Sequence, residues 1–176
     1  MELKEKLGMT GGIEAYSRPT PAFRNPNLTD AQYFKGGWEL EQKQKNIFVN
    51  TGYNIVADLL ANQGAYSSTR LAYFAWGDGT TTPAIADTAT TFYADCANSD
   101  TKAITTIAAF DVPTKTLLFD CYLSSADNAV ATIRKFALGN ADPITSMFNE
   151  LLFASPITKD ATTEKYFRYS LVFSQV

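Results

Sequence analysis

The chain has 176 residues, of which 45% are hydrophobic and 13% aromatic, enough for one domain with a substantial core. Its net charge of −3 and the absence of a long apolar run predict neither a nucleic-acid partner nor a membrane-spanning helix. The sequence contains no histidine, which excludes Ser-His-Asp and Cys-His catalytic pairs as well as zinc sites built with histidine.

The sequence of residues 1–45 predicts an extended N-terminal docking arm. Eight glycines and prolines interrupt this segment, so that neither a helical nor a strand period is sustained in it. Disordered tails are normally poor in aromatic residues, yet this segment carries five at intervals: Tyr16, Phe23, Tyr33, Phe34 and Trp38. We expect these rings to fill pockets on a neighbouring subunit. The alternative is that the segment wraps its own domain and completes the core.

The sequence of residues 46–176 predicts a folded body, which begins with one short helix. Asn50 or Thr51 can cap the helix N-terminus, and Gly64 is placed to end it. Between them lies one apolar stripe at helical spacing, formed by Tyr53, Ile55, Val56, Leu59 and Leu60. The pattern predicts an amphipathic packing helix of about twelve residues.

The next element is a short strand, Leu71 to Trp76, whose apolar side chains fall on both alternating sets. Such a strand is expected to be buried on both faces. Gly77 and Gly79 bracket Asp78 and predict a chain reversal. A polar loop then leads past Asp87 to a further predicted strand near Phe92.

The remaining sequence predicts only strands. Residues 102–111 and 116–124 form the clearest hairpin, and residues 130–138, 150–154 and 165–175 follow with apolar alternation. Strands at these intervals, joined by turns, predict an antiparallel β-sandwich of the jelly-roll or immunoglobulin-like type.

The sequence offers loop and interface candidates rather than a catalytic set. They are Trp76, Asp78, Thr80, Thr81 and Arg134. The threonines can contact sugars or be solvated, Trp76 can stack on a glycan or pack in the core, and Arg134 can lie at a subunit interface or discourage edge pairing. Asp78 supplies one carboxylate where a calcium loop needs several, so we expect no metal, and we expect no cofactor.

Two cysteines, Cys96 and Cys121, lie in segments that resemble strands. Two are too few for a disulfide scaffold. They are expected to be buried free thiols, although a disulfide between neighbouring strands stays open.

Five stretches resemble small structural proteins of tailed bacteriophage particles. The resemblance covers residues 46–176, and its motifs are Asn46-Ile47-Phe48-Val49-Asn50-Thr51-Gly52, Phe74-Ala75-Trp76-Gly77-Asp78-Gly79-Thr80-Thr81-Thr82-Pro83, Asp87-Thr88-Ala89, Phe136-Ala137-Leu138-Gly139-Asn140-Ala141 and Leu152-Phe153-Ala154-Ser155-Pro156-Ile157-Thr158-Lys159.

The resemblance implies a non-enzymatic virion component with a β-sandwich body. We expect a protein made in the host cytoplasm that joins the particle as a capsid decoration or as a neck, tail or baseplate component. Its partners would be other virion proteins and further copies of itself, held through the N-terminal arm. The alternative is a glycan-binding or receptor-binding module of the virion.

Overall fold

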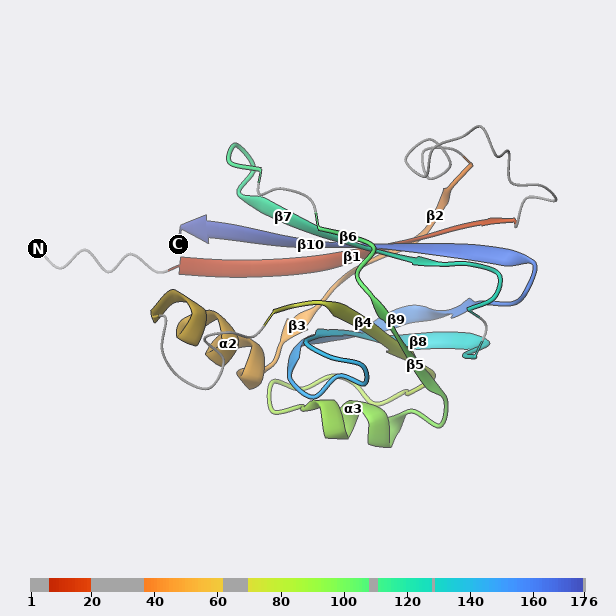
Figure 1. The fold of residues 1–176 in the computed structure, drawn as a ribbon, viewed down its shortest axis with the longest axis horizontal. Helices are drawn as coiled ribbons and strands as arrows, with labels where there is room; N and C mark the ends of the chain where they lie inside the picture. Colours follow the sequence, from red (N-terminus) through yellow and green to blue (C-terminus); the bar gives the residue numbers. More distant parts are fainter. Residues whose placement is uncertain (1–6, 20–36, 62–69, 108–110, 128, 176) are drawn as a thin grey trace, which may run out of the picture.

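The computed structural model describes residues 7–19, 37–61, 70–107, 111–127 and 129–175. These residues form two antiparallel five-stranded sheets packed face to face, together with two short helices (Figure 1). The predicted mainly-β sandwich is therefore confirmed, with one helix more than the sequence indicated. Neither helix in the described ranges has the length and apolarity needed to span a membrane.

Each sheet mixes strands from distant parts of the chain. We call the first sheet A, and its spatial order is β2 (Glu39–Lys45), β1 (Leu7–Pro19), β10 (Thr163–Gln175), β7 (Thr116–Leu123) and β6 (Thr106–Ile107). We call the second sheet B, and its order is β3 (Ile47–Phe48), β9 (Met147–Thr158), β8 (Thr132–Gly139), β4 (Tyr73–Gly77) and β5 (Ser99–Ala103).

The main core lies between the two sheets. Alternate residues of β1 and β10 point inward, so that Ile13 and Phe167 are fully buried. Phe136 of β8 lies opposite them, with its ring 5.3 Å from that of Phe167 and 4.7 Å from that of Phe74. Interdigitated aromatic rings of this kind bury a large apolar area and hold the two sheets together.

A third layer covers the other face of sheet B. Helix α3 (Ala89–Asp95) packs there, on the side remote from sheet A (Figure 1). The small side chains of Ala75 and Ala137 on this face leave room for Phe92, which is 1% exposed. This packing confirms the expectation that the strand ending at Trp76 is buried on both faces.

Helix α2 (Asn50–Ala61) confirms the predicted short helix, and it packs against β9. Ile55 and Gly52 are buried in it, whereas Tyr53 is 45% exposed. Leu59, Leu60 and Gly64 lie outside the residues whose side chains are described.

The expected boundary between an arm and a body at residue 45 is corrected by the structure. Strand β1 pairs with β10 along all of its 13 residues and with β2 on its other side. The described parts of residues 1–45 therefore complete the sandwich, as in the alternative considered for this segment. Phe23, Tyr33 and Phe34 lie outside the described residues, and their contact with a neighbour stays a prediction.

Two further expectations are corrected. The segment around Phe92 is helix α3, because Thr88 and Thr91 form a reciprocal capping box at its start and Phe92 is buried against sheet B. Strand β8 carries a bulge between Ile133 and Lys135, which shifts its alternation by one residue. Ile133 and Phe136 therefore both enter the main core, although strict alternation places them on opposite faces.

The central position of β1 generates a stability prediction. Replacing Ile13, which is fully buried, with alanine removes core contacts and is expected to lower the free energy of unfolding by about 2–4 kcal/mol. Thr10→Ala on the exposed side of the same strand is the matched control, with an expected change within about 0.5 kcal/mol. Urea denaturation measures both, and equal midpoints for the two variants would contradict the placement of β1 in the core.

Candidate functional site

A buried lysine lies between sheet B and helix α3. Lys135 follows the bulge in β8 and shares a strand face with Ala137, towards the helix layer, where Lys135 is only 2% exposed. Burying an ammonium group is costly unless opposite charges and hydrogen bonds replace its water. The surrounding residues should therefore supply carboxylates.

Two carboxylates contact the ammonium group of Lys135. Its Nζ lies 2.5 Å from Oε1 of Glu150, on the adjacent strand β9, and 2.9 Å from Oδ2 of Asp95, at the end of α3. The Glu150 side chain is 0% exposed and that of Asp95 is 18% exposed. We call Lys135, Glu150 and Asp95 the Lys135 cluster.

The loop between β4 and α3 closes over this cluster. Thr81 donates to Asp95 twice, from its backbone N–H to Oδ2 at 3.1 Å and from its hydroxyl to Oδ1 at 2.6 Å. A Cβ at Gly79 would lie 2.3 Å from Oδ2 of Asp95 and 2.8 Å from Cδ of Lys135. A side chain at this position would therefore displace the ion pair, which favours glycine here.

Burial and the neighbouring charges shift the pKa values of these groups in opposite directions. Burial raises the pKa of Glu150 to about 7, against the hydrogen bond from Lys135, and the nearby Asp87 carboxylate adds to the rise. Burial also works to lower the pKa of Lys135, but the hydrogen bonds to Glu150 and Asp95 outweigh it and raise that pKa. For Asp95, hydrogen bonds from Thr81 and Lys135 outweigh burial and lower the pKa.

The structure separates the candidate loop residues into different roles. Trp76 is 1% exposed in the main core, which rules out the glycan-stacking alternative for this ring. Asp78 accepts hydrogen bonds from the backbone N–H and side-chain Nδ2 of Asn98, at 2.9 and 2.6 Å, and so fixes the turn. Thr80 is exposed, whereas Thr81 binds the Lys135 cluster.

Arg134 lies at the bulge of β8 and is half-buried. This position does not show whether Arg134 lies at a subunit interface or discourages edge pairing, so both roles stay predictions. The sequence pattern indicated Arg134 as a candidate, but it did not indicate Lys135 or Glu150 as residues of a buried charged cluster. Both charged residues lie in strands that are otherwise rich in apolar residues, and this is the signal that could have indicated them.

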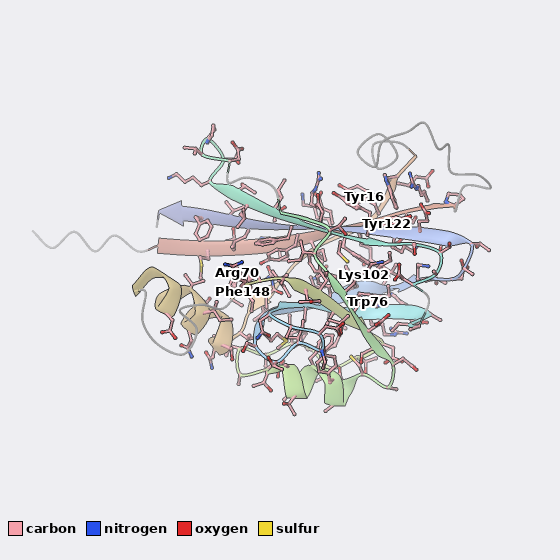
Figure 2. The ribbon with its side chains drawn as sticks, viewed as in Figure 1. Tyr16, Arg70, Trp76, Lys102, Tyr122 and Phe148 are labelled. Carbon is pink, nitrogen blue, oxygen red and sulfur yellow. The ribbon has the colours of Figure 1, made fainter. Side chains whose placement is uncertain are left out.

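Two of the predicted arm aromatics, Tyr16 and Trp38, meet on the outer face of sheet A. The register aligns Tyr16 with Tyr166, and Tyr166 with Tyr122, so that one aromatic row crosses β1, β10 and β7. The ring of Tyr16 lies 5.9 Å from that of Tyr166. Figure 2 shows Tyr16 and Tyr122 at sheet A, with Trp76 at sheet B.

Trp38 packs onto this row from the chain segment before β2. Its ring lies 5.6 Å from Tyr166 and 6.1 Å from Tyr122, and the guanidinium carbon of Arg18 lies 4.3 Å from its centroid. Gly37, with a φ of 75°, allows the turn that brings Trp38 there. We call Tyr16, Trp38, Tyr122 and Tyr166 the aromatic row; all four residues are half-buried.

Among the described residues, no group of three or more Cys, Asp or Glu is arranged to hold a metal ion. Cys96 and Cys121 are buried free thiols, so the possible disulfide is not formed, and Cys96 ends α3 rather than lying in a strand. Burial raises the pKa of both thiols. Compared with known proteins, the chain matches no protein-family model, no curated protein and no solved structure.

The raised pKa of Glu150 generates a prediction about pH. The pKa of this carboxyl is 4.5 ordinarily and about 7 in the folded chain. At a pH between these two values, the folded carboxyl therefore binds more protons than the unfolded one. Its contribution to the free energy of unfolding therefore falls as the pH rises through this range. Glu150→Gln cannot titrate and lacks the effect.

Urea denaturation of both proteins at pH 5 and pH 8 tests this sign. The stability advantage of the unmodified chain over Glu150→Gln is expected to shrink by about 1–3 kcal/mol from pH 5 to pH 8. An advantage that stays constant or grows with pH would show that the carboxyl does not have a raised pKa.

Proposed function

We propose that the protein is a non-enzymatic structural component of a bacteriophage particle. Its location would be the capsid surface, as a decoration protein, or the neck, tail or baseplate. It acts by presenting surface to copies of itself and to other virion proteins. Two features support this proposal: the sequence resemblance over residues 46–176 and the structural use of the residues that carry it.

The observation that carries the proposal is that the polar residues of the motifs are used in bonds within the chain. Asp78 binds Asn98, and the Asp87 carboxylate accepts the N–H of Ala84 at 2.6 Å. Thr81 binds Asp95, which in turn pairs with Lys135. Groups used in this way maintain a loop and have few lone pairs left for a substrate, which favours a scaffold role.

Exposed apolar side chains offer contact surface for assembly. Ile47 and Tyr53 lie just before and within α2 and are 39% and 45% exposed. The backbone N–H at the start of α2, on Asn50, donates to the carbonyl of Ile85, which is 54% exposed. Apolar groups gathered in one region favour contact with another subunit, which supports a homo-oligomer.

Localisation on intact particles tests the proposed function. Phage particles are purified from cells that carry the gene, their proteins are identified by mass spectrometry, and antibody against this chain is located by electron microscopy. We expect the chain in multiple copies per particle, with label on the shell, neck or tail. Complete particles that lack the chain would contradict the proposal.

A second candidate function is glycan binding, which the aromatic row specifically favours. Its rings lie on an outer sheet face, and half-buried aromatic rings can stack on sugar rings. This surface differs from the loop that carries Thr80 and Thr81, the threonines expected from the sequence to contact sugars or be solvated.

A glycan array measures this candidate. If the aromatic row binds sugars, Trp38→Ala is expected to reduce binding at least tenfold, because it removes the largest ring of the patch. Tyr53→Ala, which removes an exposed ring from α2, is the control and should bind as the unmodified chain does. An array without signal at high protein concentration would exclude the candidate.

A further inference from the structure

The Lys135 cluster holds the ammonium group of one lysine in contact with two carboxylates, those of Asp95 and Glu150. Nζ of Lys135 lies 2.9 Å from Oδ2 of Asp95 and 2.5 Å from Oε1 of Glu150. Asp95 is thus placed to be attacked, while Glu150 is placed to take and return protons. Holding reactants in contact in this way removes most of the entropic cost of bringing them together.

We propose that Lys135 and Asp95 condense to an intramolecular amide, with Glu150 as the proton carrier. Glu150 first takes a proton from the Lys135 ammonium, and the free amine attacks Cγ of Asp95. Glu150 returns this proton to one oxygen of Asp95 and then carries a second proton from the attacking nitrogen to the same oxygen. The Cγ–O bond breaks as this oxygen leaves as water, and the Nζ–Cγ bond remains. The three ammonium hydrogens end as one amide hydrogen and two in the released water, so that no oxidant, reductant or other co-reactant is needed.

The ion pair stabilises the ammonium and the carboxylate, so the reaction depends on the two groups that assist it, Glu150 and Thr81. Burial raises the pKa of Glu150 to about 7, so this carboxyl can hold a proton near neutral pH. Thr81 donates to both oxygens of Asp95 and fixes the orientation of the carboxyl group under attack. Hydrogen-bond donors at this place also stabilise the negative charge that develops on oxygen during attack.

The product is favoured because it removes buried charge. The amide is neutral, whereas the unreacted site keeps an ammonium and a carboxylate away from water at a desolvation cost. The new bond would join the end of α3 to β8 covalently and clamp the outer layer onto sheet B. A covalent clamp of this kind restricts the unfolded chain much as a disulfide does.

A second lysine–aspartate pair provides an internal control. Lys102 of β5, labelled in Figure 2, lies 2.5 Å from Oδ2 of Asp127. Its side chain is 32% exposed and that of Asp127 is 24% exposed, against 3% for Lys135. In place of a second carboxylate, the Asp127 oxygen accepts from Ser124. We expect this pair to remain an ion pair.

Mass spectrometry of the purified full chain tests the proposal. Under denaturing conditions the intact mass should be lower than the sequence mass by one water. Trypsin should then release a branched species that joins residues 71–102 to residues 135–159, because acylated Lys135 is not cleaved. Lys102 should be cleaved normally. Closure of Asp78-Gly79 to a succinimide also loses water, but it leaves peptide 71–102 unbranched.

Variants separate the roles of the three residues. Lys135→Arg keeps the charge and should show the full sequence mass, and Glu150→Gln should cross-link at least tenfold more slowly. Lys102→Arg, the matched control, should keep the loss of water and the branched species. The proposal is overturned if the folded, unmodified chain has the full sequence mass with normal cleavage after Lys135, a result that does not depend on any variant folding.

Discussion

The burial of one ammonium group organises the outer half of the molecule. Lys135 lies beneath helix α3 at 2% exposure, so its charge must be compensated by groups brought there by the fold. Glu150 comes from the neighbouring strand and Asp95 from the end of the helix. Glycine is favoured at residue 79 because a Cβ there would displace the Asp95 and Lys135 side chains. The loop, the helix and sheet B therefore meet in this polar contact set, beside a small apolar core.

The outer faces of sheet A and sheet B differ in what they expose. Sheet B is covered by a helix layer and hides its charges, whereas the outer face of sheet A carries the aromatic row and paired charges such as Arg168 with Asp120, 3.0 Å apart. The proposed particle role uses exposed apolar residues around α2, and the glycan alternative uses the aromatic row. The same scaffold can therefore present two distinct contact surfaces. An experiment on one surface does not test the function proposed for the other.

The sandwich, helix α2 and the strand ending at Trp76 could be predicted because their apolar periods are regular. Strand β1 could not, since its glycines break the pattern; Gly11 lies there because a Cβ would meet the Tyr169 hydroxyl at 2.1 Å, a contact made only in the folded sheet. The spacing of Tyr16 and Trp38 correctly indicated packing, but the partner is the chain's own sheet. The Lys135 cluster joins β8, β9 and the end of α3, which are separated in the sequence, and no local sequence pattern specifies this contact.

The central claim is that the Lys135 cluster fastens the loop and helix α3 to sheet B, and native-state hydrogen exchange tests it most directly. Lys135→Met keeps the bulk of the side chain but removes its charge and its bonding to Asp95 and Glu150. We expect amide exchange to accelerate selectively in residues 77–98, while β1 and β10 of sheet A keep their protection. Unchanged exchange in residues 77–98, or an equal acceleration throughout the protein, would contradict the claim.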